Sequence, residues 1–383
     1  MRYIKPEYYD DFACIADRCP DTCCAGWQIV IDEESLTRYE AEAERGQDIF
    51  SKRLETSIDW QEGVFCQKEK RCAFLNAENL CDLYTKLGAD GLCKTCREYP
   101  RHTEEFEGLR ELSLSLSCPV AAEMILRQEH FPNFQEYETD EPEELWEEFE
   151  DFDLLLFTQL EDARRIIFTI LKESDQPLIQ KMKWVLSFSK ELDDCVGDGD
   201  FARMDEIIKG AQLRKVEWEF ADCLLERYQM LEENFQVLEE MELLRADWLE
   251  KRDAARKILY DQGFEHYKEL VERFDMQYEI NGVEGIPISR IAENLFVTFV
   301  YTWFCGAVYN GWVYSKMAMA AFCTFYILEF ILAEWVQKGE QLAFADCVEL
   351  TWRFTREVEH SEENLSILED WFIKESPDAP EEF

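Results

Sequence analysis

The crowding of cysteines into one part of the chain is the feature that most constrains how it folds. Ten of the 15 cysteines lie within residues 14–118, and the 265 residues that follow contain only five. The ten are Cys14, Cys19, Cys23, Cys24, Cys66, Cys72, Cys81, Cys93, Cys96 and Cys118. Such a concentration indicates that the N-terminal third uses its thiols for more than packing.

Metal binding is the use that the spacing favours. Cys93 and Cys96 are separated by two residues, which places both sulfurs on one side of a tight turn. The adjacent Cys23 and Cys24 cannot easily bridge to each other. These features suit zinc or an iron–sulfur cluster. A disulfide framework is typical of small secreted domains, whereas this chain is long and begins with charged residues rather than an apolar signal segment. Reduced buried thiols are the third alternative.

We expect the metal ligands to come from several loops that converge, so that the metal acts as the core of a small domain. The densest motifs contain Cys23, Cys81, Cys93 and Cys96, which are the strongest candidates. The full set of expected ligands is Cys19, Cys23, Cys24, Cys72, Cys81, Cys93, Cys96 and Cys118. One site and two sites are both open.

Five short motifs carry a resemblance to a known family. They are residues 21–27 (DTCCAGW), 72–75 (CAFL), 81–84 (CDLY), 93–101 (CKTCREYPR) and 115–119 (SLSCP). Together they resemble the flagellin lysine-N-methylase (FliB) family, whose N-terminal part is similar to small zinc- or iron-chelating proteins. The resemblance is dense from Phe12 to Val120 and weak afterwards, where only residues 293–295 (ENL) look familiar.

The resemblance implies an activity and its cofactors. It implies a protein-lysine N-methyltransferase that contains an iron–sulfur cluster of the 4Fe-4S type and transfers methyl groups from S-adenosylmethionine to lysine ε-amines of flagellin. Zinc stays the alternative metal. The alternative function is a non-catalytic metal-binding or electron-transfer module that docks a basic partner through an acidic helical domain.

The expected fold class is mainly α. We expect a small, irregular cysteine-cluster metal-binding domain with a few short strands in residues 1–139, and a larger α-helical bundle domain with an acidic surface in residues 140–383. The boundary is placed in residues 123–153, which contain 13 acidic residues and one arginine and therefore read as a linker or a solvated helix.

Local patterns predict the elements of the first domain. Residues 1–13 read as a polar entry segment whose Tyr3, Tyr8, Tyr9 and Phe12 pack under the cysteine cluster. Residues 28–32 are rich in β-forming residues, and Asp32 is the expected N-cap of a helix over residues 33–46. Residues 65–81 predict a hairpin whose turn, at residues 76–79, sets Cys72 opposite Cys81.

Helical periodicity dominates the second domain. Apolar residues at three and four spacing predict helices over residues 154–172, 177–194, 204–209, 217–262 and 265–279. Residues 295–315 contain no charged residue and are long enough to cross a bilayer. A second apolar run, residues 317–335, is interrupted by Glu329 and Glu334. We favour two buried central helices over a membrane hairpin, because polar residues and no positive cluster accompany the first run.

Charge limits the possible partners. The formal net charge is −43, which argues against nucleic acid, because phosphate binding needs clustered lysine and arginine. Residues 1–118 hold 15 basic and 24 acidic residues, and residues 119–383 hold 25 and 59. The acidic second part suits a lysine-bearing protein such as flagellin, although solubility alone explains it equally well. We expect a cytoplasmic protein with neither a nucleic-acid nor a membrane partner.

The common catalytic motifs are missing from the sequence. It contains no Gly-x-Gly-x-x-Gly and no P-loop, and a C-x3-C-x2-C motif fails because Gly26 stands where the third cysteine belongs. We therefore assign no catalytic residue.

The methyl-donor site is predicted from chemistry alone. Adenine needs a stacking face and the donor carboxylate needs a cation, which suggests Trp27, Arg97 and Arg101 as cofactor-binding residues. We expect them at the domain junction, with residues 303–315 as the facing wall. The alternative roles are packing for Trp27 and structural ion pairs for the arginines.

Overall fold

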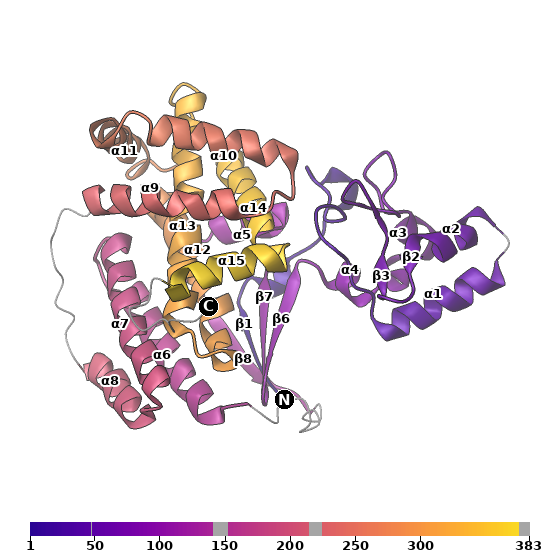
Figure 1. Cartoon of the computed structure of the whole chain (residues 1–383), viewed down its shortest axis with the longest axis horizontal. Helices are drawn as coiled ribbons and strands as arrows, with labels where there is room; N and C mark the ends of the chain where they lie inside the picture. The colour runs from indigo at the N-terminus through magenta and orange to yellow at the C-terminus, as the bar shows by residue number, and fades with distance from the viewer. Residues whose placement is uncertain (47, 141–151, 214–223, 375–383) are drawn as a thin grey trace.

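The computed structural model describes residues 1–46, 48–140, 152–213 and 224–374. It consists of a small lobe, built from the cysteine-rich segment, beside a larger helical lobe (Figure 1). Each lobe has its own hydrophobic core. The smaller core contains Tyr39, Phe65, Phe74 and Cys93 among others, and the larger one includes residues from Tyr8 to Phe372. The prediction of a mainly α protein with few short strands is confirmed.

Short elements build the small lobe. Its helices are α1 (Glu33–Arg45), α2 (Ile49–Ser57), α3 (Asp82–Leu87) and α4 (Lys94–Glu98), with 3-10 turns η2 (Ala16–Arg18) and η3 (Ala89–Gly91). Two antiparallel pairs of two-residue strands complete it: β2 (Ile58–Asp59) with β3 (Val64–Phe65), and β4 (Gln67–Lys68) with β5 (Arg71–Cys72).

Asp32 organises this lobe. Its Oδ1 accepts a hydrogen bond from the Ser35 backbone N–H at 2.9 Å, which confirms it as the N-cap of α1. Its Oδ2 accepts from the Lys94 backbone N–H at 2.7 Å, at the start of α4. One carboxylate therefore holds together the N-termini of two helices, and α4 carries Cys96.

Two local predictions for this lobe need correction. Residues 28–32 form no strand, since Val30 makes only an isolated bridge to Val64. The turn at residues 76–79 is present, because the Asn76 N–H donates to the Leu80 carbonyl at 2.9 Å. The pairing differs from expectation, however: Cys81 lies opposite Leu75, and Cys72 lies opposite Gln67 across the tighter β4–β5 turn.

A four-stranded sheet underlies the large lobe. Its order is β6 (Arg101–Phe106), β7 (Leu109–Leu114), β1 (Arg2–Pro6) and β8 (Phe134–Glu138). β1 runs parallel to β7, and the other neighbours are antiparallel. The prediction that residues 1–13 are a polar entry segment was wrong, as was that of a linker or helix at residues 134–138. Both were misread because their strands pair with partners distant in the sequence.

The aromatic residues near the N-terminus also lie elsewhere than predicted. Tyr8 and Phe12 are buried in the larger core and do not pack under the cysteine cluster. The 3-10 turn η1 (Tyr9–Asp11) sits between them. Each lobe is therefore stabilised by its own apolar residues, and the chain enters the large lobe before it builds the small one.

Helices form the rest of the large lobe. They are α5 (Pro119–Leu126), α6 (Leu154–Glu173), α7 (Leu178–Asp198), α8 (Phe201–Leu213), α9 (Leu224–Glu240), α10 (Ala246–Leu259), α11 (Phe264–Tyr278), α12 (Ile288–Trp303), η5 (Phe304–Tyr309), α13 (Val313–Gln337), α14 (Phe344–Glu359) and α15 (Glu362–Lys374). The helix predicted over residues 217–262 is interrupted between α9 and α10. There the N–H groups of Glu242 and Leu244 donate to the Asn364 and Glu357 side chains.

The two apolar runs form the centre of this lobe. α12 with η5, and α13, are long and apolar enough to cross a membrane, but 78% and 89% of their most apolar windows are buried inside the protein. Figure 1 shows α13 passing through the middle of the lobe. Glu329 is tolerated there because Tyr267 and Tyr260 donate to it at 2.8 and 3.1 Å, along with Arg227. These contacts support buried core helices.

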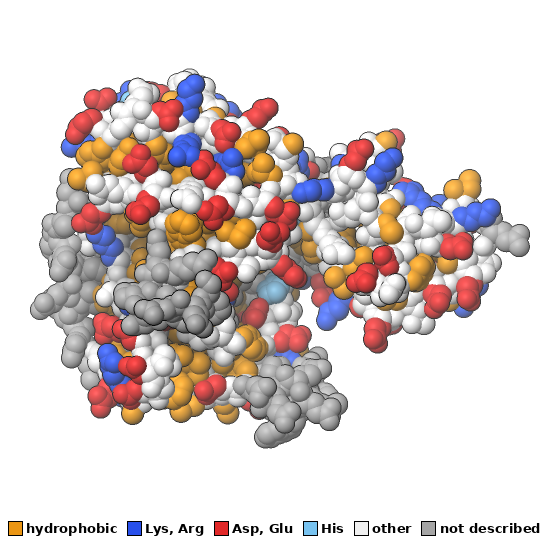
Figure 2. All heavy atoms as spheres, viewed as in Figure 1, with side chains coloured by type: hydrophobic (Ala, Val, Ile, Leu, Met, Phe, Trp, Pro, Cys, Tyr) orange, Lys and Arg blue, Asp and Glu red, His pale blue; other side chains and the backbone are white. Residues whose placement is uncertain are grey.

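Acidic side chains are spread over the face seen in Figure 2, with basic side chains between them. The domain boundary predicted near residue 140 adjoins residues 141–151, which lie outside the described part of the chain, as do Cys223 and the acidic tail from Pro377.

Candidate functional site at the junction of the lobes

Most of the predicted metal ligands converge in the small lobe. The Cys24 thiol is hydrogen-bonded to both Cys23 and Cys81, which joins the loop before Trp27 to the start of α3. Cys93 and Cys96, at the two ends of the first turn of α4, are hydrogen-bonded to each other. Cys23 and Cys72 lie close enough to Cys96 for their charges to raise its pKa. Six predicted ligands thus share one region: Cys23, Cys24, Cys72, Cys81, Cys93 and Cys96.

These contacts divide the thiols into hydrogen-bond donors and acceptors. The hydrogen bond from Cys24 lowers the pKa of Cys81 to about 6 and also lowers that of Cys23. The hydrogen bond from Cys96 lowers the pKa of Cys93 in the same way. Burial raises the pKa of Cys72 to about 11. Because the thiolate is the form that binds metal, three of the six already favour the ligating state.

The other two predicted ligands lie on the large-lobe side of this group. Cys118 precedes α5 and belongs to the larger core, where burial raises its pKa to about 11. Cys19 is half-buried, and its charge reaches Cys118, as does that of Cys23. Cys19 and Cys118 are therefore within electrostatic range of each other, and Cys23 is within the same range of Cys118.

The donor set fits a thiophilic metal in its chemistry. The group is made of sulfur atoms, the donors that zinc and iron–sulfur clusters use, and it lies in a lobe with only a small apolar core. Within residues 1–46, 48–140, 152–213 and 224–374, no three His, Cys, Asp or Glu side chains are already arranged around one ion position. Binding would replace the present S–H···S hydrogen bonds with sulfur–metal bonds.

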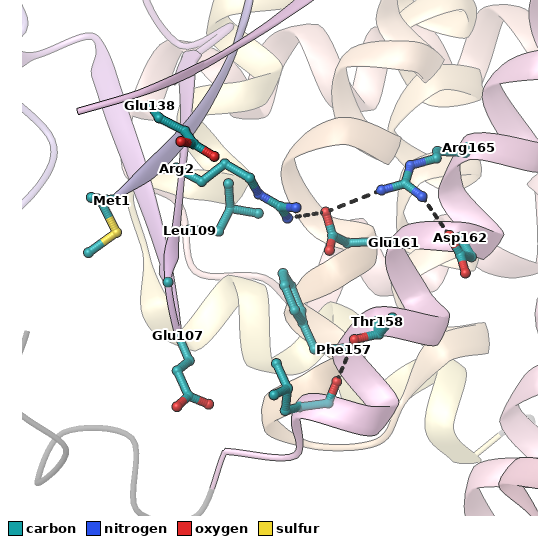
Figure 3. Close-up of a pocket in the computed structure, with 12 residues that line it drawn as sticks. Met1, Arg2, Glu107, Leu109, Glu138, Phe157, Thr158, Glu161, Asp162 and Arg165 are labelled. Carbon is teal, nitrogen blue, oxygen red and sulfur yellow. Dashed lines mark hydrogen bonds and ion pairs between the residues drawn. The ribbon is translucent and has the colours of Figure 1, made fainter. Parts of the chain in front are cut away.

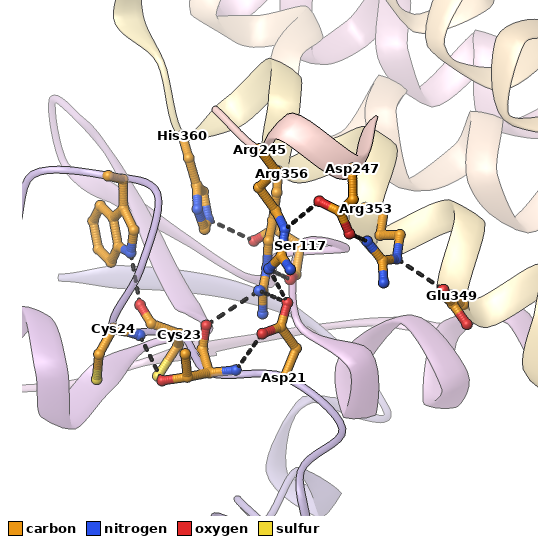
Figure 4. Close-up of polar contacts among 12 residues, drawn as sticks. Asp21, Cys23, Cys24, Ser117, Arg245, Asp247, Glu349, Arg353, Arg356 and His360 are labelled. Atoms are coloured by element: carbon orange, nitrogen blue, oxygen red, sulfur yellow. Dashed lines mark hydrogen bonds and ion pairs between the residues drawn. The ribbon is translucent and has the colours of Figure 1, made fainter. Parts of the chain in front are cut away.

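Asp21 connects the cysteine loop to the large lobe. Its Oδ2 accepts a hydrogen bond from Arg356 Nη1 at 2.9 Å and another from Arg245 (Figure 4). Arg356 Nη1 also donates to the Thr22 carbonyl at 3.2 Å, and its Nε donates to the Ser117 carbonyl at 2.7 Å. Since Arg356 is only 3% exposed, the last turn of α14 is fixed to the loop that carries Cys23.

A connected row of side chains lies beside this ion pair. Ser117 Oγ is 2.9 Å from the Tyr99 hydroxyl, 3.0 Å from His360 Nε2 and 2.5 Å from Ser115 Oγ. Ser115 Oγ in turn donates to Glu359 Oε2 at 2.7 Å. The row joins the end of β7 to the end of α14.

Two of these groups have strongly shifted proton affinities. Burial raises the pKa of Glu359 to about 7. Burial and the adjacent Arg356 charge lower the pKa of His360 to about 3, so its imidazole is neutral at neutral pH. The Nδ1 atom of that imidazole is buried and has no hydrogen-bond partner in the structure. Groups with shifted pKa values gather at functional sites more often than elsewhere.

Trp27 brings the cysteine loop against this row. Its indole lies with ring centres 5.0 Å from His360 and 5.8 Å from Tyr99, and its Nε1 donates to the Cys23 carbonyl at 2.8 Å. Of the three predicted donor-binding residues, Trp27 is therefore at the junction itself.

The two arginines have different surroundings. Arg101 donates to the Phe12 carbonyl at 3.0 Å and lies 5.0 Å from the centre of the Phe12 ring, a position that favours a structural role. Arg97, on α4, is exposed and makes no side-chain hydrogen bond or ion pair with the described residues. Of the two, Arg97 is the cation open to a ligand.

The predicted facing wall of the donor site is not at the junction. Tyr309, in η5, donates to the Glu105 carbonyl and stacks on Phe106, near the far end of β6 from Arg101. Four residues of extended strand span about 13 Å. The loops around Trp27 and the segment 303–315 therefore do not form opposite walls of one pocket.

A cavity of about 540 Å³ opens near the start of β1 (Figure 3). It is lined by Arg2, Leu109, Phe157 and several carboxylates, and its arginines are already used: Arg2 pairs with Glu161 at 2.6 Å and Arg165 pairs with Asp162 at 2.5 Å. No cysteine lines it. Both of its arginines are paired with carboxylates and it has no cysteine, so it adds nothing to the candidate site.

Sequence reasoning missed the residues that the large lobe contributes to the junction. Ser115 and Ser117 lie in the motif of residues 115–119, which could have drawn attention to them. The sequence around Arg356, Glu359 and His360 contains no motif that indicates a function. His102, on β6, contacts Glu104 Oε2 at 3.0 Å through its Nε2. That contact raises the pKa of His102.

Comparison with known proteins gives matches in sequence. Residues 164–382 match the family model described as the FliB lysine N-methylase C-terminal domain. The chain is 29% identical over 127 residues, or 32% of its length, to the flagellar biosynthetic protein FliU of Salmonella muenchen, covering 75% of that protein. It is equally similar to the lysine-N-methylases of Salmonella choleraesuis and Salmonella typhimurium, but covers only 32% of each. No solved structure matches.

The position of the family match corrects one expectation. The resemblance was expected to be weak after Val120, yet the matched model begins at residue 164 and covers more than half of the chain. It includes α14, and with it Arg356, Glu359 and His360 of the junction.

Proposed function

The chain belongs to the FliB lysine N-methylase family, and from that premise we propose that it is a protein-lysine N-methyltransferase. The observation that carries the proposal is the match of residues 164–382 to the C-terminal domain of that family. Two curated relatives named lysine-N-methylase support the same activity. The name of a third, a flagellar biosynthetic protein, supports flagellin as the protein that bears the target lysines.

S-adenosylmethionine is the proposed methyl donor, and the converging cysteines are the proposed ligands of an iron–sulfur cluster. The six converging thiols suit a 4Fe-4S cluster in chemistry and exceed the four that such a cluster needs, with zinc as the alternative metal. When bound, such a cluster supplies a one-electron redox centre and a covalent core for the small lobe. Trp27, Arg97 and Arg101 stay the proposed contacts of the donor.

Methyl transfer to lysine makes one demand that this chain must meet by itself. The ε-amine attacks only when it is neutral, and a free lysine ammonium titrates near pH 10.4, at about its reference pKa. A functional site therefore has to desolvate the ammonium, repel it with a positive charge, or take its proton. The junction contains an aromatic surface, a buried arginine and a neutral imidazole.

The test is a methylation assay with protein purified without oxygen. Purified flagellin and S-adenosylmethionine carrying an isotopically labelled methyl group are incubated with the protein, and labelled lysine is sought by peptide mass spectrometry. We expect the wild-type protein to produce labelled methyl-lysine in flagellin. The Cys24→Ser variant should produce none. Cys347→Ala is the matched control, because Cys347 is buried in the helical core.

Metal analysis of the same samples separates the alternatives. Iron with sulfide and broad visible absorption supports the iron–sulfur cluster, whereas bound zinc without that absorption supports zinc. Stable metal binding without methylation of any lysine would favour a non-catalytic metal-binding or electron-transfer module and contradict the proposed activity.

A further inference from the structure

We propose that His360, Ser117, Ser115 and Glu359 form a proton relay that takes the proton from the substrate amine at the junction of the lobes. The inference rests on the proposed function and names the place where the lysine side chain reacts. The four side chains are already connected in sequence, from His360 Nε2 to Ser117 Oγ at 3.0 Å, then to Ser115 Oγ at 2.5 Å and to Glu359 Oε2 at 2.7 Å.

One arrangement of hydrogens satisfies the whole row. If His360 carries its proton on Nε2, it donates to Ser117 Oγ, Ser117 donates to Ser115 Oγ, and Ser115 donates to the Glu359 carboxylate. The Tyr99 hydroxyl and the Ser117 backbone N–H can donate to the two serine oxygens as well. Every hydrogen bond then points the same way, toward Glu359, which is the direction in which a proton would travel.

The beginning of the relay is an acceptor without a partner. With the proton on Nε2, Nδ1 of His360 holds a lone pair, and that atom is buried without a hydrogen bond. Buried polar atoms are almost always paired, so an unpaired one calls for an explanation. An ammonium N–H is a donor of the kind that this acceptor lacks.

The surroundings of His360 favour loss of the proton from an amine. The rings of Trp27 and Tyr99 lie 5.0 and 5.9 Å from the imidazole and provide an apolar surface. Arg356, at 3% exposure, adds a positive charge close by, which the Asp21 carboxylate at 2.9 Å offsets in part. Desolvation and a neighbouring cation both lower the pKa of an amine.

The end of the relay is a carboxylate able to keep a proton near neutral pH, because burial raises the pKa of Glu359 to about 7. Among the described residues, one other charged group acts on Glu359. His102, on β6, lies close enough for its charge to act on Glu359, and it is paired with Glu104 on the same strand. Ser115, after β7, is the hydrogen-bond donor to Glu359.

The proposed transfer is balanced. Nδ1 of His360 accepts a proton from the lysine ammonium while Nε2 releases one to Ser117, which passes its hydroxyl proton to Ser115, and Ser115 passes its own to Glu359. The amine is left neutral, Glu359 becomes a neutral acid, and His360 changes tautomer. The amine lone pair then forms the N–CH3 bond as the S–CH3 bond of S-adenosylmethionine breaks, and the electron pair of that bond stays on sulfur.

Access to the relay depends on the cysteine loop. Nδ1 is closed to solvent and the Trp27 indole lies against the imidazole, so an amine reaches Nδ1 when Trp27 moves aside. Trp27 is held by the Cys23 carbonyl. The position of the metal-binding loop would therefore control entry of the lysine side chain.

The test is the pH dependence of single-turnover methyl transfer in three variants: His360→Gln, Ser117→Ala and Glu359→Gln. Each should slow the reaction about 100-fold at neutral pH, the usual scale of acid–base catalysis. The loss should shrink as the pH approaches that at which lysine is neutral without help. The matched control is His130→Gln, because His130 is exposed. Metal content and thermal unfolding of each variant show whether it folds.

A second measurement does not depend on activity. The chain has four histidines, so nitrogen spectra of histidine-labelled protein, compared with those of His360→Gln, identify the His360 signals. We expect a neutral ring protonated on Nε2. Protonation on Nδ1 instead, or active variants with the pH profile of the wild type, would overturn the relay while wild-type methylation still supports the proposed function. Absence of methylation by the wild-type protein would overturn both.

Discussion

The Asp21 carboxylate accepts a hydrogen bond from the Arg356 guanidinium at 2.9 Å, although the two residues are 335 positions apart. Asp21 lies two residues before Cys23, and Arg356 lies three residues before Glu359. The contact therefore joins the cysteine loop of the small lobe to the helix that ends at the polar row of the junction. The loop meets this end of the large lobe twice, through the Asp21–Arg356 pair and through the Trp27 indole, whose ring centre lies 5.0 Å from that of His360.

Asp21→Asn should destabilise the protein by about 2–3 kcal/mol, because it leaves Arg356 buried without its counter-charge. Unfolding by urea or heat measures the loss. The matched control is Asp247→Asn, whose carboxylate pairs with Arg353 at the surface, since the Asp247 side chain is 51% exposed. That change should cost less than about 1 kcal/mol. Equal costs for the two variants would mean that the contact does not hold the lobes together.

Serine at Cys23, Cys81, Cys93 or Cys96 should remove metal and unfold the small lobe, since binding of a structural metal is coupled to folding. Metal analysis and the protease sensitivity of residues 13–100 measure the two effects. The contacts of Cys24 with Cys23 and Cys81, and of Cys93 with Cys96, are the structural reason for this choice.

The comparison for that prediction comes from the helical core. Alanine at Cys195, Cys305, Cys323 or Cys347 should leave the metal content unchanged, because these cysteines are buried among helices. Cys223, the remaining cysteine after residue 118, lies outside the described residues. Full metal content in all four serine variants of the small lobe would show that the ligand set is wrong.

Local signals in the sequence predicted local structure well. The Asp32 cap and the helices α6 and α11 follow from a capping residue and from apolar periodicity, each of which acts within a few residues. Cys93 and Cys96, close in sequence, are likewise hydrogen-bonded to each other. The contact of Cys24 with Cys81 joins two separate loops and could not be predicted from spacing.

Long-range pairing could not be predicted in this way. β1 is polar on its own and becomes a strand only because β7 and β8 lie on either side of it, more than 100 residues later. The same is true of the junction, where Ser117 and His360 are 243 positions apart. A lone histidine at the end of a helix carries no signal of its role until the partner that contacts it is known.

Glu357 should make stability depend on pH. Burial raises the pKa of its carboxyl from 4.5 to about 7, so the folded state binds this proton more tightly than the unfolded state. The contribution of this carboxyl to the free energy of unfolding is fully present below pH 4.5 and is lost as the pH rises through about 7. Glu357→Gln should therefore gain about 2–3 kcal/mol relative to wild type between about pH 5 and pH 8.

Urea unfolding of wild type and Glu357→Gln at about pH 5 and pH 8 measures that change. A destabilising effect of the glutamine that does not vary with pH cancels when the two pH values are compared. Glu349→Gln is the control on the same helix, since the Glu349 side chain is 45% exposed and pairs with Arg353. A relative stability of Glu357→Gln that stays constant with pH would show that this carboxyl is ionised in the folded protein.

Association with a lysine-rich protein should slow as salt is added. Residues 119–383 hold 59 acidic and 25 basic residues, and such a field attracts cations only over the screening length of about 8–10 Å. Stopped-flow binding to flagellin at low and high salt measures the rate, with a fixed pH and metal content. An unchanged rate would leave solubility as the role of the acidic surface.

Arg97→Ala and Arg101→Ala should have opposite consequences. Arg101 donates to the Phe12 carbonyl and lies over the Phe12 and Tyr9 rings, so its loss should cost about 1–2 kcal/mol of stability. Arg97 is exposed and has no side-chain hydrogen bond or ion pair among the described residues, so its loss should leave stability within about 0.5 kcal/mol. If Arg97 holds the carboxylate of S-adenosylmethionine, its removal should weaken donor binding about tenfold, the effect of losing one charge-assisted hydrogen bond. Calorimetric titration with the donor checks this, and unchanged affinity in both variants with metal intact would place the donor site elsewhere.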